Sequence, residues 1–281
     1  MELVLQAALI GLLQGLTEFI PVSSSAHLEL APWLFGWQTD GLLSSLSFDV
    51  FLHLGTLIAL LAYFAGDWIR LLRAAAASIV ERRIGADHDR RLAWLLIVAT
   101  LPAAAIGFVG EDLINQVFHG SSSALRLAIA GFVVLGAVVL WLADRYGSQR
   151  EQIEDLTGMK AVSIGLSQAA ALLPGISRSG ATMSAGLLFG LTREAAARFS
   201  FLLATPITLG AGLYGSRHLL TEAHTGNEWL AIGAAFAAAT ISGALAIGFL
   251  LRWLRTRSMT VFSVYRLAFA ALIVGLVIAG R

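Results

Sequence analysis

Six long apolar stretches constrain this chain more than any other feature of its sequence. A helix needs about 20 apolar residues to cross the roughly 30 Å hydrocarbon core of a bilayer. Hydrophobic residues make up 57% of the 281 residues and charged residues 13%, against about 45–50% and 25% in a typical soluble domain. We therefore expect an all-α integral membrane protein, a single membrane domain over residues 1–281 with six transmembrane helices. The expected helices cover residues 48–66, 92–110, 125–143, 197–215, 229–250 and 262–279.

Charge and cysteine content exclude several other classes of protein. The net charge is +1, so the chain as a whole has no electrostatic attraction for nucleic acid. It contains no cysteine, which excludes a disulfide framework, a thiolate metal site and a cysteine nucleophile. The N-terminal apolar segment has no positive charge ahead of it, so we expect it to belong to the mature protein rather than to a signal peptide.

Two further apolar regions are interrupted. The first runs over residues 3–20, meets Pro21 and a serine-rich turn, and continues over 26–37. The second runs over 160–173, is broken at Pro174-Gly175, and continues over about 180–191. Broken helices persist at membrane depth only where they are buried in protein or line a wet cavity. We therefore predict that both regions are re-entrant helix hairpins.

The two interrupted regions also match each other in sequence. When the chain is shifted by 154 residues, 11 positions in residues 7–36 are identical to their counterparts, where composition alone gives about 3. The match predicts two repeat halves, about 1–144 and 155–281, each with one hairpin and three spans. Since three is odd, the halves run in opposite directions through the membrane, which is the inverted-topology repeat of many proteins with a site at the midplane.

Basic residues predict how the chain lies in the membrane. With six spans, fourteen Lys and Arg residues fall on one side, in the segments 67–91, 144–160, 193–198 and 252–257, and three fall on the other. Cytoplasmic loops carry the excess of Lys and Arg. Both termini are therefore expected outside the cytoplasm. The first hairpin then enters from the outside and the second from the cytoplasm.

The first hairpin contains an acid in an apolar helix. Gln14 and Glu18 are four residues apart, so they share a helix face. An ionisable group at membrane depth is costly and usually marks a site, although Glu18 could also be a polar residue wetted at the hairpin tip. Ser23 and Ser24 are suited to cap the next helix after Pro21, and His27 can lie over them as a functional residue or a buried structural one.

The second hairpin carries an arginine, Arg178, at the position where the first carries Ser24. Its turn places Gly175, Ser177 and Ser179 around Arg178, with Thr182 one helical turn further on. Serine hydroxyls and free N–H groups at a helix start form an anion-binding cradle, and the planar guanidinium matches phosphate. The alternative is a capped turn whose arginine reaches for the membrane surface.

Three other features remain open at this level. Asp49 and His53 share a helix face at the start of a predicted span, either beside the site or as ordinary interfacial residues. Thr205-Pro206 indicates a helix kink. Arg266, in the last predicted span, could pair with an acid or lie at the interface.

The two turns resemble the motifs of a known family. Residues 14–27, QGLTEFIPVSSSAH, and residues 174–182, PGISRSGAT, are similar to the first and second motifs of the undecaprenyl-diphosphate phosphatases of the bacitracin-resistance type. The resemblance extends over the whole chain in length and span pattern. In that family the first motif has Glu or Gln at the position of Gln14.

The resemblance implies an enzyme of the bacterial plasma (inner) membrane that removes the terminal phosphate of undecaprenyl diphosphate. Its substrate is a polyprenyl diphosphate lipid, its product is recycled for cell-wall synthesis, and its excess confers bacitracin resistance. The resemblance also implies a divalent cation, Mg²⁺ or Ca²⁺, while the orientation predicted from the basic residues places the site facing outward. The oligomeric state stays open, with a homodimer as one possibility.

The hypothesis that follows assigns a role to each residue of the two turns. Arg178 and its neighbours hold the diphosphate, and Glu18 with Gln14 holds the cation or orients the nucleophile. Ser24 attacks phosphorus or positions water, and His27 acts as general acid/base or accepts the phosphoryl group. The expected catalytic residues are Glu18, Ser24, His27 and Arg178, and the expected substrate-binding residues are Gln14, Ser23, Gly175, Ser177, Ser179 and Thr182.

Two rival functions use the same residues. Inverted repeats are common in transporters, so a polyprenyl-phosphate flippase is one alternative, although it needs no nucleophile. An intramembrane serine protease is the other, but Arg178 and the two helix N-termini suit an anionic substrate better than a peptide bond.

Overall fold

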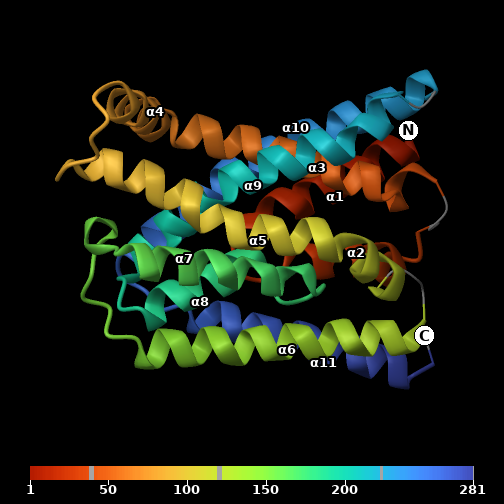
Figure 1. Ribbon diagram of the computed structural model, residues 1–281. Coiled ribbons are helices and arrows are strands. Elements are labelled where there is room, and N and C mark those ends of the chain that lie inside the picture. The colour runs from red at the N-terminus through yellow and green to blue at the C-terminus, as the bar shows by residue number, and fades with distance from the viewer. Residues whose placement is uncertain (38–40, 119–121, 222–223, 281) are drawn as a thin grey trace.

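The computed structural model describes residues 1–37, 41–118, 122–221 and 224–280, which fold into helices and connecting turns without a β-strand (Figure 1). The α-helices are α1 (Glu2–Phe19), α2 (Ser24–Phe35), α3 (Leu46–Tyr63), α4 (Ala65–Val80), α5 (His88–Phe118), α6 (Ser123–Tyr146), α7 (Gly158–Ser167), α8 (Arg178–Leu188), α9 (Arg193–Thr221), α10 (Gly226–Leu254) and α11 (Thr260–Ile278). The short 3₁₀-helices are η1 (Leu42–Ser44), η2 (Ile153–Asp155) and η3 (Gln168–Leu172).

The helix lengths confirm an all-α membrane protein. Within the described residues, six helices are long and apolar enough to cross a bilayer: α1, α5, α6, α9, α10 and α11. Five of them are spans that the sequence predicts. The sixth is α1, expected only as one arm of a hairpin, which has the length of a span on its own.

The predicted span 48–66 and the loop after it need correction. The helix α3 ends at Tyr63, and the chain then bends by 80° into α4. Most of the expected loop 67–91 is helical, because it contains most of α4. This helix includes the alanine run 74–77, and alanine has the highest helix propensity. One side of α4 is buried at Leu71 and Ser78, while its charged residues remain outside the core.

The two hairpins enter the molecule from opposite ends. The pair α1/α2 begins at the end where both termini lie, and the pair α7/α8 begins at the other end (Figure 1). Pro21 follows the end of α1, and Ser23 caps α2 with its side chain. In the second hairpin the regular α7 gives way to η3 before the turn, and Ser177 caps α8 in the same way.

Each hairpin packs on a helix from the other predicted half. Gly11 of α1 lies against the backbone of Ala235 in α10, and Gly165 of α7 lies against the backbone of Ala99 in α5. Positions 11 and 165 are related by the 154-residue shift. This exchange of partners supports the inverted repeat, which stays a prediction.

The close helix contact at Gly165 predicts a large effect of a side chain there. A Cβ at Gly165 would overlap the carbonyl oxygen of Ala99, so Gly165→Val is expected to destabilise the protein by about 3 kcal/mol, the upper range for overpacking. Thermal unfolding in detergent measures the effect. Gly233→Val is the matched control, because the space around Gly233 is open; equal loss in both variants would contradict the predicted packing.

The four basic segments gather at the end of the molecule opposite the termini. Contacts between charged side chains join them there: Arg198 pairs with Asp67 at 3.1 Å, and Arg255 pairs with Glu194 at 3.2 Å. Arg193 also pairs with Asp144. Both termini are at the other end, on opposite edges of the molecule (Figure 1). The structure thus agrees with the predicted separation of charge, and the assignment of the basic end to the cytoplasm stays a prediction.

Candidate functional site

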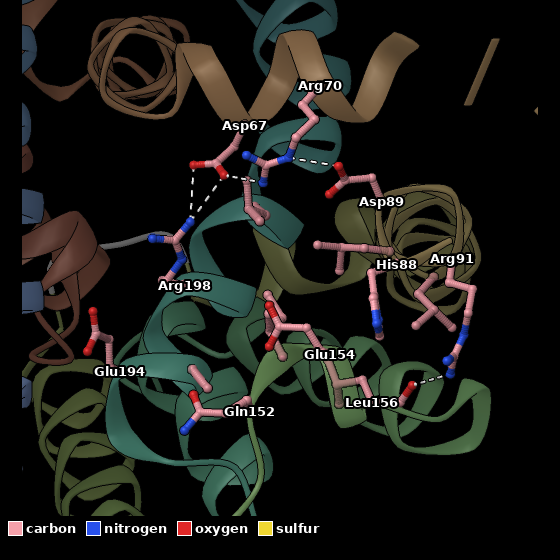
Figure 2. A pocket seen from close by; sticks show the side chains of 15 residues that line it. Asp67, Arg70, His88, Asp89, Arg91, Gln152, Glu154, Leu156, Glu194 and Arg198 are labelled. Atoms are coloured by element: carbon pink, nitrogen blue, oxygen red, sulfur yellow. Dashed lines mark hydrogen bonds and ion pairs between the residues drawn. The ribbon is translucent and has the colours of Figure 1, made fainter. Parts of the chain in front are cut away.

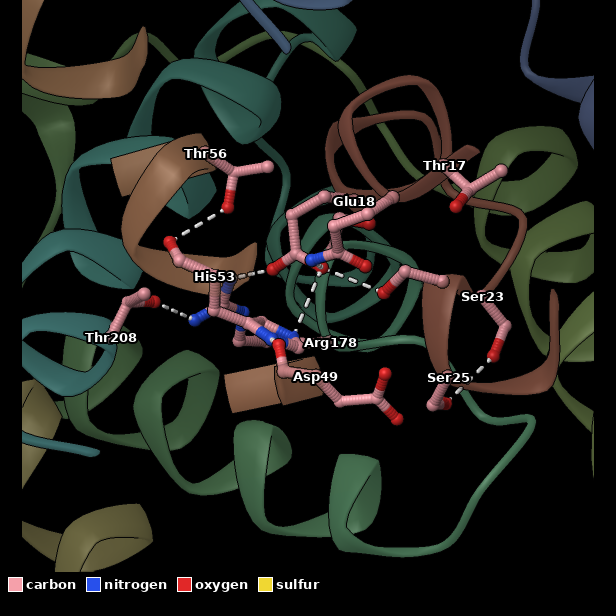
Figure 3. A network of polar contacts seen from close by, with 12 residues as sticks. Thr17, Glu18, Ser23, Ser25, Asp49, His53, Thr56, Arg178 and Thr208 are labelled. Atoms are coloured by element: carbon pink, nitrogen blue, oxygen red, sulfur yellow. Dashed lines mark hydrogen bonds and ion pairs between the residues drawn. The ribbon is translucent and has the colours of Figure 1, made fainter. Parts of the chain in front are cut away.

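The turns of the two hairpins meet inside the protein. The backbone N–H of Gly175 donates to Ser25 Oγ at 3.4 Å, and Arg178 of α8 forms an ion pair with Glu18 of α1. Figure 3 shows the polar network that surrounds this meeting point. A carboxylate, a guanidinium and serine hydroxyls from two distant parts of the sequence are therefore brought into one site.

The Glu18 carboxylate is the centre of this network. Its side chain is 4% exposed. One carboxylate oxygen, Oε2, accepts hydrogen bonds from Ser24 Oγ at 2.6 Å and from Gln14 Nε2 at 3.1 Å, and it lies 3.5 Å from His53 Nε2. The other oxygen, Oε1, accepts from Arg178. A buried charge needs such partners, and the Ser24 contact is aligned for transfer of the hydroxyl proton to the carboxylate.

Arg178 connects three helices. It lies at the first position of α8, its guanidinium pairs with Glu18 of α1, and it also donates to Thr208 Oγ1 of α9. Its side chain is 21% exposed, much more than that of Glu18. Since a guanidinium has five N–H donors, Arg178 has donors left for an anion on its exposed side.

Two serine-capped helix starts have the same local geometry. Ser23 and Ser177 both have φ of 76°, which is unusual for a residue other than glycine. Ser23 Oγ accepts from the backbone N–H of Ala26 at 3.4 Å, and Ser177 Oγ accepts from that of Gly180 at 3.1 Å. Helix starts carry partial positive charge and unpaired N–H groups. The two starts therefore favour an anion at the site.

Further serines support these turns. The hydroxyls of Ser23 and Ser25 lie 3.2 Å apart, and those of Ser177 and Ser179 are separated by the same distance. Ser23, Ser177 and Ser179 are buried, so these hydroxyls belong to the interior of the two turns.

The structure does not bring His27 into the network of Glu18. His27 Nδ1 lies 2.7 Å from the backbone oxygen of Ser23, and Nε2 lies 2.7 Å from the hydroxyl of Tyr265. The ring also stacks on Phe269, with 4.3 Å between ring centroids. Since a carbonyl oxygen only accepts, Nδ1 carries the proton and Nε2 accepts from Tyr265. His27 thus stabilises the turn at Ser23 through its backbone oxygen, without contacting Glu18.

Thr182 also has a different place from the one expected. Its hydroxyl donates to the backbone oxygen of Arg178 at 2.9 Å and lies 2.6 Å from Ser200 Oγ. It is 1% exposed. Thr182 therefore joins α8 to α9 instead of lining the space beside Glu18.

Two residues of the network come from α3 and α9. The sequence left His53 open, and the structure places it beside Glu18, with its Nδ1 2.8 Å from the backbone oxygen of Asp49. Thr208 was missed altogether. Its only signal is a hydroxyl in an apolar span just after Pro206, which does not identify the partner.

The residues around Glu18 can be tested against a divalent cation. Gln14 Oε1 is buried and has no hydrogen-bond partner among the described residues. A carboxylate and an amide oxygen are suitable ligands for a hard cation. The described ranges contain no group of three or more His, Asp or Glu arranged to hold a metal ion. Because Gln14 donates its N–H to Glu18, the two oxygens fit one cation only after the Gln14 amide turns over; the cation would then take its remaining oxygens from a phosphate ligand and water, as Mg²⁺ commonly does.

A cavity at the basic end of the molecule is a separate feature. It has a volume of about 410 Å³ and lies among α4, α5, α9 and η2 (Figure 2). Its charges are largely paired: Arg70 bonds to Asp67 and Asp89, each at 2.8 Å, and Arg198 bonds to Asp67. None of the predicted site residues lines this cavity.

Known proteins match the chain over nearly its full length. An undecaprenyl-diphosphatase of Thermomicrobium roseum is 45% identical over 266 residues, 94% of each chain. One from Desulforudis audaxviator is 46% identical over 261 residues, 93% of each chain, and one from Moorella thermoacetica is 45% identical over 271 residues, covering 96% of this chain and 97% of its own. The family described as bacitracin resistance protein BacA matches residues 7–272, and the chain belongs to this family.

Proposed function

We propose that the chain hydrolyses undecaprenyl diphosphate to undecaprenyl phosphate and phosphate at the meeting point of the two hairpin turns. The observation that carries this proposal is the contact of Glu18 with both Ser24 and Arg178. It joins a base, a hydroxyl nucleophile and a phosphate-binding group inside a membrane protein. The recycled lipid phosphate serves cell-wall synthesis in the bacterial plasma membrane, and an excess of the enzyme gives bacitracin resistance.

An incoming phosphate binds the donors that Arg178 has left on its exposed side, and it competes with Glu18 for the guanidinium. The terminal phosphate then takes the guanidinium, the hydroxyls of the α8 cap and the N–H groups at the start of α8 as donors. These groups also oppose the charge that develops on the equatorial oxygens during transfer. The polyprenyl tail stays in the hydrocarbon around the helices.

The reaction then proceeds in two steps. Ser24 Oγ attacks the terminal phosphorus while Glu18 takes its proton, and the bond from phosphorus to the bridging oxygen breaks. The electron pair of that bond leaves with undecaprenyl phosphate, and Glu18 passes the proton of Ser24 to this leaving group, so that it is a carboxylate again. In the second step, water attacks the phosphoserine with Glu18 as base, the Ser24 Oγ–phosphorus bond breaks, and the proton returns to Ser24.

A divalent cation bound at Glu18 and Gln14 would neutralise charge on the diphosphate oxygens. A Gln14→Ala variant is expected to need about tenfold more Mg²⁺ for half-maximal activity, because it loses an oxygen ligand worth about 1.4 kcal/mol. Titration of Mg²⁺ into chelator-treated enzyme measures this. Gln168→Ala is the matched control, a buried amide at the repeat-related position of the other hairpin. An unchanged Mg²⁺ requirement in Gln14→Ala would contradict the assignment.

His27 gives a contrasting prediction. Because both of its ring nitrogens are bonded away from Glu18, His27→Gln is expected to lower kcat by no more than about tenfold, the effect of losing a hydrogen bond of about 1 kcal/mol behind the turn. Phosphate release at saturating substrate measures it. A loss as large as that of Glu18→Gln would instead support His27 as the general acid/base.

The test of the proposed function is release of inorganic phosphate from undecaprenyl diphosphate by the purified protein with Mg²⁺ or Ca²⁺. We expect one phosphate and one undecaprenyl phosphate for each substrate consumed, and no release after chelation. Folded protein that releases no phosphate but moves the lipid phosphate across vesicles would instead support the flippase.

A further inference from the structure

Arg266 of α11 is a fully buried cation that the mechanism above does not use. Its exposure is 0%, and within the described part of the chain no carboxylate lies at ion-pair distance from it. A buried guanidinium is costly unless its N–H groups are satisfied. Its contacts therefore indicate what it does.

The partners of Arg266 are backbone carbonyl oxygens from both hairpin turns. Its NH1 donates to Pro21 at 3.4 Å, and its NH2 donates to Gly175 at 2.7 Å and to Ile176 at 3.1 Å. Its Nε donates to Val133 of α6 at 3.1 Å. One rigid side chain thus ties the turn that leads to Ser24 to the turn that leads to Arg178.

The contact with Ile176 also fixes the direction of an N–H group. In a trans peptide the C=O and the following N–H point in opposite directions. Because the Ile176 carbonyl points to Arg266, the N–H of Ser177 points away from it, at the start of α8.

The surrounding sequence leaves room for this guanidinium. A Cβ at Gly136 would overlap Arg266 NH2, and a Cβ at Gly180 would lie 3.1 Å from NH1. The Cβ at Gly136 would also lie 2.8 Å from the backbone oxygen of Ile176, so Gly136→Ala disturbs the contact between the guanidinium and the α8 turn without changing Arg266 itself.

The ion pair between the hairpins holds the turns less firmly during the reaction, because the phosphate then competes with Glu18 for the guanidinium of Arg178. We propose that Arg266 is a positioning residue that keeps the two turns together while the phosphate competes for Arg178. This inference rests on the proposed function, since it concerns the alignment of Ser24 and Arg178 on one diphosphate. Displacement of reacting groups by about 1 Å costs on the order of 10²-fold in rate.

The kinetic test uses Arg266→Met, Arg266→Lys and Gly136→Ala in purified, folded protein. We expect kcat to fall about 10²-fold in Arg266→Met and about tenfold in both other variants, with KM changed by less than about threefold. Arg193→Gln is the matched control, since it breaks the pair with Asp144 far from the turns; it is expected to lower thermal stability while kcat of the folded fraction stays unchanged. Wild-type kcat in Arg266→Lys and Gly136→Ala would overturn the proposal.

A second readout reports the hairpins directly and does not depend on turnover. The chain has no cysteine, so spin labels can be placed at Leu16→Cys of α1 and Leu166→Cys of α7, which are 38% and 48% exposed. We expect the distance distribution between the labels to broaden in Arg266→Met and Gly136→Ala, and to remain as in wild type in Arg193→Gln. An unchanged distribution in both test variants would overturn the proposal, whether or not the wild type releases phosphate.

Discussion

An Arg178→Ala variant is expected to release phosphate from undecaprenyl diphosphate at least about 10³-fold more slowly than the wild type, the effect of removing an arginine that stabilises a transferring phosphoryl group. Arg178 is the charged residue of the α8 turn, and its exposed side offers the donors that an incoming phosphate needs. Loss of these donors affects both binding and the transition state, so we expect kcat to fall and KM to rise. Steady-state assays over a range of lipid concentration separate the two.

Controls for Arg178 follow from its other contacts. Arg178→Lys retains the charge but loses the planar fork, so it should fall between wild type and Arg178→Ala. Thr208→Val removes the hydroxyl that accepts from Arg178 and should lower activity less than either. Full turnover by Arg178→Ala would remove the central binding residue from the proposed site.

Glu18→Gln is expected to lower kcat by about 10³-fold, within the range for loss of a general base. The amide keeps the shape of the side chain but cannot take the proton of Ser24. Arg178 loses its ion-pair partner in this variant but keeps its donors for the phosphate, so we expect KM to change less than kcat. Phosphate release at saturating lipid and Mg²⁺ measures the loss.

The matched control for Glu18→Gln is Asp49→Asn. It makes the same carboxylate-to-amide change on the neighbouring helix α3, one turn from His53. The Asp49 contact to His53 is made by its backbone oxygen, which the substitution keeps, so we expect kcat to stay within about threefold of wild type. Comparable losses in the two variants would show that charge in this region matters without a specific role for Glu18.

The sequence predicted the parts of this protein that local physics determines. An acid in an apolar helix, Pro21 at a helix end and serines at helix starts each have a local cause. The meeting of Glu18 with Arg178 followed from reading two interrupted segments as hairpins. The five spans outside the first hairpin and α3 were likewise set by their apolar length.

Other features depend on packing between distant segments, which sequence patterns do not record. The 80° bend after Tyr63 was not predicted, because apolar length alone does not show where a helix turns. His27 was expected over Ser23 and Ser24 from its spacing; it lies against Ser23, but Tyr265 and Phe269, about 240 residues later, bind its ring away from Glu18. The sequence left open whether Arg266 pairs with an acid or lies at the interface. Its actual partners are carbonyl oxygens from three separate segments, which no local pattern indicates.

The most direct test of the central claim is rapid quenching of the wild-type enzyme during turnover of substrate labelled in the terminal phosphate, once in acid, which preserves phosphoserine, and once in base, which preserves phosphohistidine. We predict that label is trapped on Ser24, and that Ser24→Ala neither retains label nor releases phosphate above about 10⁻³ of the wild-type rate, as expected when a nucleophile is removed. Label on His27, or wild-type turnover by Ser24→Ala, would contradict the account.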